Sequence, residues 1–175
     1  VWFADQCDDL APPPDPVPEL TGLFAREAGH CPRLSEVLFL DTETTGLSGG
    51  TGTLVFQLGV SWWQSDGLHT KQYFLPGPAH ETAMLLALAE LAQSFSTVVT
   101  FNGASFDLPL LRTRALLNRL PDPLRNLVSW DLLVPGRRLW GNRLVNCRQQ
   151  TLEQWVCGHE RHPGDIDGAQ IPQTW

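Results

Sequence analysis

Short apolar runs separated by turn residues dominate the first half of this chain. Four apolar residues at 37–40 lead into a polar stretch, and residues 54–63 and 70–75 form two further strand-like runs. Asp66 and Gly67 lie between the second and third runs and form a strong turn dipeptide. The pattern therefore predicts three consecutive strands, with a hairpin joining the second to the third.

The second half of the chain predicts strands that alternate with helices. Apolar residues recur at helical spacing over 81–95, and a strand at 97–101 leads into a helix over 106–120 that Pro121 and Pro123 end. The remaining predicted elements are a strand at 127–130, a short arginine-rich helix near Leu139 and a helix at 151–157. We therefore expect an α/β fold, a mixed five-stranded sheet flanked by helices, with three antiparallel strands before the parallel ones.

Composition sets the first 34 residues apart from the rest. Residues 11–19 hold five prolines and two acids, which is typical of an extended segment rather than a packed element. A chain of 175 residues with 42% apolar composition can bury one core. We expect an acidic, proline-rich arm over 1–34 and one folded domain over 35–175.

Localisation follows from what the sequence lacks. No apolar run approaches the roughly 20 residues that cross a bilayer, and no charged-then-apolar leader opens the chain. The cysteines include no CxxC pair and favour reduced thiols, and Cys147, Cys157, His159 and His162 match no common zinc spacing. We expect a cytoplasmic protein with no membrane partner.

The charge is unevenly distributed. The formal net charge of −7 argues at first against nucleic acid, because phosphate binding draws on Lys and Arg. Residues 1–47 hold nine acids and two arginines, whereas residues 108–150 hold eight arginines and two aspartates. The second half therefore presents a basic surface, which suits either a phosphate-binding face or an ordinary solvated helix face.

Acidic residues follow two of the predicted strands. Asp41 and Glu43 leave the first strand two positions apart, so both project from one face, where a cation would offset their repulsion. Asp107 lies in the first turn of a helix that follows another strand. Functional groups gather beyond the carboxyl ends of parallel strands, and oxygen ligands suit Mg²⁺ or Mn²⁺. Asp131, after the last strand, could support the metal ligands or cap the next helix, and the cap is favoured.

Two segments together resemble a known family. LFLDTETTGL, followed by VVTFNGASFDLPLLRTRA, is similar to the first two motifs of the DEDD (DnaQ-like) 3'-5' exonucleases, and more closely to the YprB-like branch of this RNase-H-like superfamily. SWDLLVPGRRLW, TLEQWVCGHERHPGDIDG and IPQTW are also similar to that branch, so the resemblance spans about residues 36–175. It implies an RNase-H-like sheet in which Asp41, Glu43 and Asp107 hold metal ions.

The resemblance also suggests residues that contact substrate. Asn102 and Phe106 would shape the cleft around the acids. The glycine-rich segment 46–52 lacks the Lys-Ser/Thr of a P-loop, so Gly46 is expected to line the cleft floor, where bare backbone can approach nucleic acid. Thr44, two residues earlier, is a further expected substrate contact.

The sequence differs from the family pattern at the fourth carboxylate. DEDD enzymes place it on a late helix. His162 and Asp167 fit the H-x4-D spacing of one subclass, but the residues around them predict a loop. In the YprB-like branch the fourth aspartate is expected beyond residue 175. We therefore expect the domain to stop before its last helix, with Asp167 as the alternative ligand.

The implied activity is 3'-5' exonucleolytic hydrolysis of phosphodiester bonds at a single-stranded 3' end, in DNA or RNA. Two ions, Mg²⁺ or Mn²⁺, would act about 3.5 to 4 Å apart, with Asp41 as the shared ligand. One alternative is an inactive nucleic-acid- or protein-binding module of the same fold. A less favoured one is a phosphohydrolase with Asp41 as nucleophile, which needs a lysine, and the only one is Lys71 on an early strand.

Overall fold

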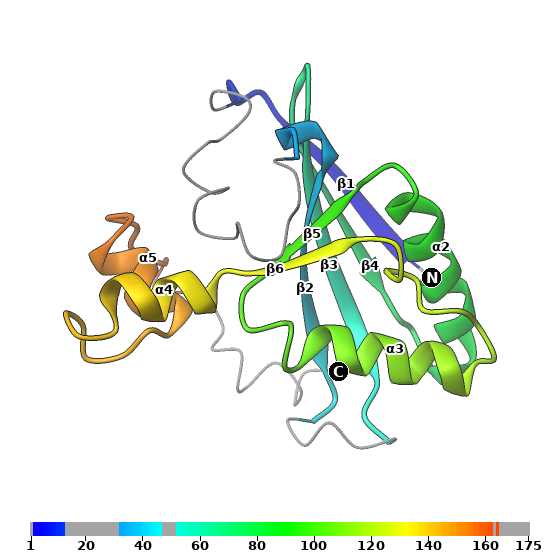
Figure 1. Ribbon diagram of the computed structural model, residues 1–175. Coiled ribbons are helices and arrows are strands. Elements are labelled where there is room, and N and C mark those ends of the chain that lie inside the picture. Colours follow the sequence, from blue (N-terminus) through cyan, green and yellow to red (C-terminus); the bar gives the residue numbers. More distant parts are fainter. Residues whose placement is uncertain (1, 13–31, 47–51, 163, 165–175) are drawn as a thin grey trace.

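The computed structural model describes residues 2–12, 32–46, 52–162 and 164. Six strands form one sheet in the spatial order β1-β4-β3-β2-β5-β6 (Figure 1). The strands are β1 (Trp2–Asp8), β2 (Val37–Thr44), β3 (Val55–Gln64), β4 (Gly67–Phe74), β5 (Thr97–Thr100) and β6 (Val128–Asp131). The helices are α2 (Glu81–Ala92), α3 (Asp107–Leu117), α4 (Leu133–Trp140) and α5 (Gln149–Trp155), with two 3-10 turns, η1 (Leu34–Glu36) and η2 (Pro78–His80).

The strand directions confirm the predicted fold class. β1, β4, β3 and β2 pair antiparallel in that order, whereas β5 runs parallel to β2 and β6 runs parallel to β5. β3 and β4 form the predicted hairpin, with Gly67 at a φ of +140°. Parallel neighbours need a crossover, and α2 and α3 are the helices that precede β5 and β6.

β1 is a strand that the sequence analysis did not predict. It lies inside the segment expected to be an arm, and it adds a sixth strand by pairing with β4 along its whole length. Residues 3–7 are exposed, so no buried stripe marks the strand in the sequence. Lys71 of β4 helps to hold it, with its Nζ 3.3 Å from Asp5 Oδ1 and 5.0 Å from the centre of the Phe3 ring. Residues 13–31, which include most of the proline-rich stretch 11–19, lie outside the described residues.

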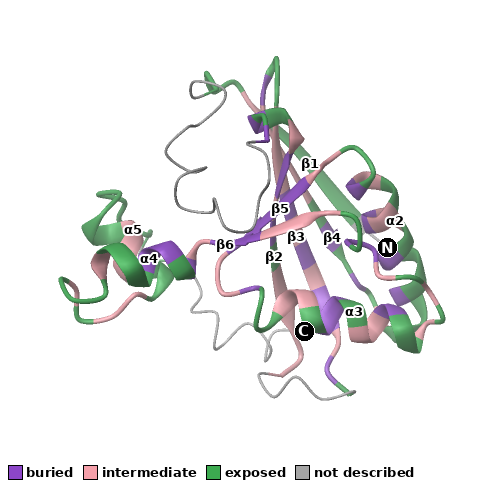
Figure 2. Cartoon of the chain, in the orientation of Figure 1, coloured by how far each residue is buried: buried purple, intermediate pink, exposed green. Residues whose placement is uncertain are grey.

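The core has a large and a small part, one on each face of the sheet. Leu38 and Leu40 of β2 belong to the large part, which includes most of the buried residues of α2 and α3. Val37 and Phe39 alternate with them and belong to a small cluster around Trp130 on the other face. Figure 2 shows burial concentrated in the sheet, and α5 has no buried residue. No described helix combines the length and apolar character that crossing a membrane requires.

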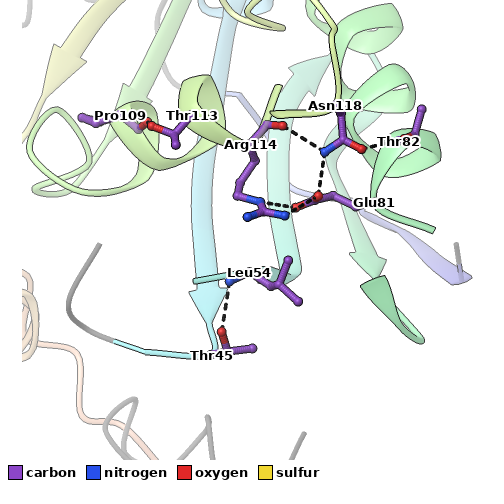
Figure 3. A network of polar contacts seen from close by, with 8 residues as sticks. All are labelled: Thr45, Leu54, Glu81, Thr82, Pro109, Thr113, Arg114 and Asn118. Carbon is purple, nitrogen blue, oxygen red and sulfur yellow. Dashed lines mark hydrogen bonds and ion pairs between the residues drawn. The ribbon is translucent and has the colours of Figure 1, made fainter. Parts of the chain in front are cut away.

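A buried ion pair fastens α3 to the start of α2 (Figure 3). Arg114 donates from Nε and Nη2 to the two carboxylate oxygens of Glu81, at 2.5 and 2.7 Å. Asn118 donates to Glu81 Oε2 at 2.6 Å and to the Arg114 carbonyl at 2.9 Å, while Thr82 donates to Asn118 at 2.7 Å. The pair sets the position of α3, whose first residue is Asp107.

Candidate functional site

β2 carries two of the predicted site residues. Asp41 and Glu43 alternate with Thr42 and share a face of the strand with Phe39. They line an open cavity of about 430 Å³ on the sheet face opposite the large core. The other side chains of that face that line it are Phe39, Gln57, Ser61, Thr70, Gln72 and Val99, together with Phe101, Leu132 and Gln149. The register of β2 on β3 shifts after Glu43, an irregularity of the kind that re-aims side chains beside functional sites.

Thr42 connects β2 to the third acid. Its side chain lies on the same face as Leu38 and Leu40, towards α3, and its hydroxyl donates a hydrogen bond to Asp107 Oδ1. Asp107 is the first residue of α3, where the helix dipole favours a carboxylate. The structure thus places Asp107 beside the strand of Asp41 and Glu43. The sequence analysis missed Thr42, although strand alternation already placed it on the helix side.

Asp131 holds the loop that leads from β5 to α3. It is buried at the end of β6, and its Oδ1 accepts hydrogen bonds from the backbone N–H of Asn102 at 2.7 Å and of Leu133 at 2.9 Å. Its Oδ2 accepts a third from the N–H of Ala104 at 3.1 Å. The bond to Leu133 is of the helix-capping kind expected from the sequence, made from one position before the N-cap. The two loop bonds are an additional role, because Asp131 fixes the segment just before Asp107.

Backbone conformation shapes the same loop. Asn102 has a φ of 65°, in the left-handed region that asparagine tolerates. A Cβ atom added to Gly103 would lie 2.5 Å from the Cβ of Thr100, so only glycine fits there. The Gly103 carbonyl accepts the N–H of Phe106 at 3.2 Å and of Leu108 at 2.9 Å. The turn therefore begins α3 at Asp107.

The three acids disfavour one another's charge. Partial desolvation and then the charge of Asp107 raise the pKa of Asp41, and Arg161 opposes this more weakly. Desolvation, then the charges of Asp41 and Asp107, raise the pKa of Glu43. Desolvation also raises the pKa of Asp107, against the hydrogen bond from Thr42. Three oxygen donors whose negative charges repel one another are a donor set that suits a divalent cation.

The ligand oxygens of the three acids are nevertheless too far apart to surround a single ion as they stand. These oxygens do not all lie within 4.8 Å of one another. Among the described residues, the one group of three ligating side chains that meets this spacing is Cys7, Asp66 and His69. Ligands shared between two ions about 3.5 to 4 Å apart are spaced more widely than the ligands of one ion.

A second hollow adjoins the acidic cavity. It measures about 380 Å³ and shares Phe101 and Gln149 with the first. Asn102, one of the predicted substrate-contacting residues, lines it together with Arg137 and Arg148. Two exposed arginines from the basic half of the chain thus line the hollow that adjoins the acidic cavity.

The other predicted contacts lie near the acids without lining either hollow. Thr44 donates from Oγ1 to the carbonyl of Gly46 at 3.0 Å. Phe106 directly precedes Asp107, and 57% of its surface is exposed. Asp167 and the glycine-rich residues 47–51 lie outside the described residues.

Lys71 is poorly placed for the phosphohydrolase reaction weighed above. Thr70 and Gln72 of β4 line the acidic cavity, so the side chain of Lys71 between them points to the other face. There it forms its ion pair with Asp5 and approaches the ring of Tyr73 at 5.9 Å.

Comparisons with known proteins agree on the fold. The model of the RNase H superfamily matches residues 38–175. The uncharacterised protein YprB of Bacillus subtilis (strain 168) is 38% identical over 144 residues, which are 81% of this chain and 34% of YprB. The chain therefore spans about a third of the length of this curated relative.

Solved structures of exonuclease I share the arrangement of elements. One, described as suggesting how processivity is achieved, superposes with a TM-score of 0.57 at 19% identity, over 71% of this chain and 36% of the other. A second, of SSB/exonuclease I with an inhibitor, gives 0.58 at 18% identity over 78% and 40%. E. coli exonuclease I in complex with a 5cy-dT13 oligonucleotide gives 0.55 at 18% identity over 71% and 36%. At such identities the likeness concerns the fold, and together with the match over residues 38–175 it leads to one conclusion: this chain belongs to the RNase H superfamily.

Proposed function

We propose that this chain carries the catalytic domain of a metal-dependent exonuclease that shortens nucleic acid from its 3' end. The observation that carries the proposal is the meeting of acids from two distant segments: Asp41 and Glu43 line an open cavity, and the charge of Asp107 raises the pKa of both. The fold is shared with exonuclease I, of which one structure is a complex with a 5cy-dT13 oligonucleotide.

Asp41, Glu43 and Asp107 would hold the ions, Mg²⁺ or Mn²⁺. Bound there, two divalent cations supply an activated water and stabilise the leaving 3'-oxygen of an in-line displacement. The protein contributes the positions of the carboxylates. Thr42 orients Asp107 by its hydrogen bond, and Asp131 holds the preceding loop, so both act as positioning residues.

The substrate strand would run from the basic hollow to the acidic one. Arg137 and Arg148 line the first and attract phosphates, while the neutral polar side chains of the second accept the end of the strand. The exposed ring of Phe106, next to Asp107, offers a stacking surface for a terminal base. An aromatic surface of this kind reads no sequence, which suits an exonuclease acting on any strand.

The test is a shortening assay on labelled single-stranded DNA and RNA. A 5'-labelled strand should give a ladder that descends from full length with Mg²⁺ or Mn²⁺ and none with EDTA. Asp41→Asn and Asp107→Asn should each lower the rate about 100-fold or more, because each removes a charged ligand. Asp122→Asn is the matched control, since Asp122 is an acid bound to Arg112 and the backbone of Leu124 outside the site.

Two results would count against the proposal. Metal-independent cleavage, or cleavage that the Asp41 variant retains, would show that the acids do not carry the reaction. A stable complex with either strand and no shortening would instead identify a binding module of the same fold. Asp167→Asn, assayed in the same way, tests the alternative fourth ligand.

A further inference from the structure

Three side chains with metal-binding groups meet at the end of β1. Cys7 lies directly opposite His69 in the β1–β4 register, and Asp66 belongs to the turn between β3 and β4. Cys7 Sγ lies 3.6 Å from His69 Nε2, which lies 2.8 Å from Asp66 Oδ1. One ligand atom from each residue lies within 4.8 Å of the other two. Within the described part of the chain, this is the one group of three such side chains with that spacing.

The group is built by close backbone approach. A Cβ on Gly67 would lie 2.2 Å from the carbonyl oxygen of Asp8, so the end of β1 can lie against the hairpin only because residue 67 is glycine. The ring of Trp62 stacks on His69, with centroids 5.6 Å apart and an interplanar angle of 17°. Trp62 in turn packs edge-on against Phe95 at 6.1 Å, beside the large core. The orientation of the imidazole is therefore set by the core.

The geometry matches a tetrahedral zinc ion. Bonds of about 2.3 Å to sulfur and about 2.0 Å to nitrogen place those two ligand atoms about 3.5 Å apart. The separation of Cys7 Sγ and His69 Nε2, 3.6 Å, is already close to this value. Nitrogen and oxygen ligands stand about 3.3 Å apart around zinc, so Asp66 would move outward slightly from its hydrogen bond of 2.8 Å.

The surrounding charge favours a cation at the same place. Partial desolvation and then the negative charges of Asp66, Asp8 and Asp9 raise the pKa of the Cys7 thiol. A bound cation would reverse this effect, because it stabilises the thiolate that coordinates it. Thiolate, imidazole and carboxylate together select zinc over Mg²⁺ and Ca²⁺, which prefer oxygen ligands alone.

We propose that Cys7, Asp66 and His69 bind a zinc ion, with water as the fourth ligand. The ion fastens the edge strand β1 to the β3–β4 hairpin. The site is separate from the acids, because His69 lies on the opposite face of β4 from Thr70 and Gln72, which line the acidic cavity. The zinc site is therefore distinct from the candidate nuclease site, and it stands whether or not the chain is a nuclease.

Cobalt serves as the probe, because a cobalt–thiolate bond gives a charge-transfer absorption band that oxygen ligands do not. The reduced, chelator-treated protein is titrated with Co²⁺ and then with Zn²⁺. The band should appear with one equivalent of Co²⁺ and disappear as Zn²⁺ displaces it. Cys7→Ser should abolish the band, and His69→Gln should weaken Co²⁺ binding more than about tenfold. Cys157→Ser, which removes an exposed thiol elsewhere, should leave the band unchanged.

The outcomes separate this site from the acids. A variant with Asp41→Asn and Asp107→Asn should retain the full cobalt–thiolate band, whatever the nuclease assays show. Hydrogen exchange should slow in β1 of the wild-type protein on adding Zn²⁺ and stay unchanged in Cys7→Ser. Absence of the band in the wild type, or a band of equal strength in a folded Cys7→Ser variant, would overturn the proposal. Circular dichroism establishes that each variant is folded.

Discussion

Asp131 offers the sharpest test of how the candidate site is held in place. Its carboxylate accepts three backbone N–H groups, those of Asn102, Ala104 and Leu133, at 2.7, 3.1 and 2.9 Å. Asp131→Ala removes both acceptor oxygens and so all three hydrogen bonds at once. The perturbation therefore frees the loop before Asp107 and the first turn of α4 without touching any of the three acids.

The expected cost follows from the surroundings of each bond. The bond to Leu133 is buried, so its unpaired N–H costs about 2 kcal/mol, whereas the bonds to Asn102 and Ala104 are nearer solvent and contribute about 1 kcal/mol each. We expect the free energy of unfolding to fall by about 4 kcal/mol in Asp131→Ala. Asp131→Asn keeps one acceptor oxygen and turns an amide N–H towards Ala104, so it should cost about 1 to 2 kcal/mol.

Urea denaturation followed by circular dichroism measures the free energy of unfolding. The exonuclease rate, measured under conditions in which each variant remains folded, reports whether the loop still positions Asp107. Asp131→Ala should lose at least about tenfold in rate, and Asp131→Asn less, since a displaced Asp107 weakens metal binding. Asp122→Ala is the control, because that carboxylate likewise accepts a backbone N–H, from Leu124 at 2.9 Å, but lies away from the site. If Asp131→Ala costs under about 1 kcal/mol, or if folded protein keeps its full rate, our account of Asp131 is wrong.

Three further predictions concern stability. Arg114→Met should lower the free energy of unfolding by about 3 to 5 kcal/mol, because it leaves the charge of the buried Glu81 carboxylate without its cationic partner. Adding Glu81→Met should restore part of the lost stability, and equal losses in the single and double variants would refute this. Gly103→Ala should cost about 1 to 3 kcal/mol in a thermal melt, because its methyl group would meet Thr100; an unchanged melting temperature would show that the loop relaxes freely. Burial and the charge of Asp107 raise the pKa of Asp41 above its ordinary value of 3.8. Protonation of Asp41 therefore stabilises the metal-free fold fully when the pH is below 3.8, and this stabilisation is lost as the pH rises through the raised pKa. Asp41→Asn should therefore melt higher than the wild type in EDTA at pH 7, with a gap that narrows on acidification, and a lower melting temperature would contradict the assignment.

Local patterns predicted the central strands and helices well. The hairpin at Asp66 and Gly67 was confirmed, because an aspartate-glycine turn between two apolar runs leaves few other conformations. β1 was missed for the opposite reason. Its side chains are exposed, and what holds it is backbone pairing with β4, which no local pattern of residues records.

The sequence by itself determined the order of the strands and helices from β2 onward, and the placing of Asp41, Glu43 and Asp107 at the ends of elements, because hydrophobic periodicity and turn residues act over a few positions. Only the tertiary structure decided which distant groups meet. The hydrogen bond of Thr42 to Asp107, the hold of Asp131 on the 102–104 loop, and the approach of Cys7 to His69 all join residues more than 25 positions apart. Such contacts depend on strand register and helix packing, which the whole core sets at once.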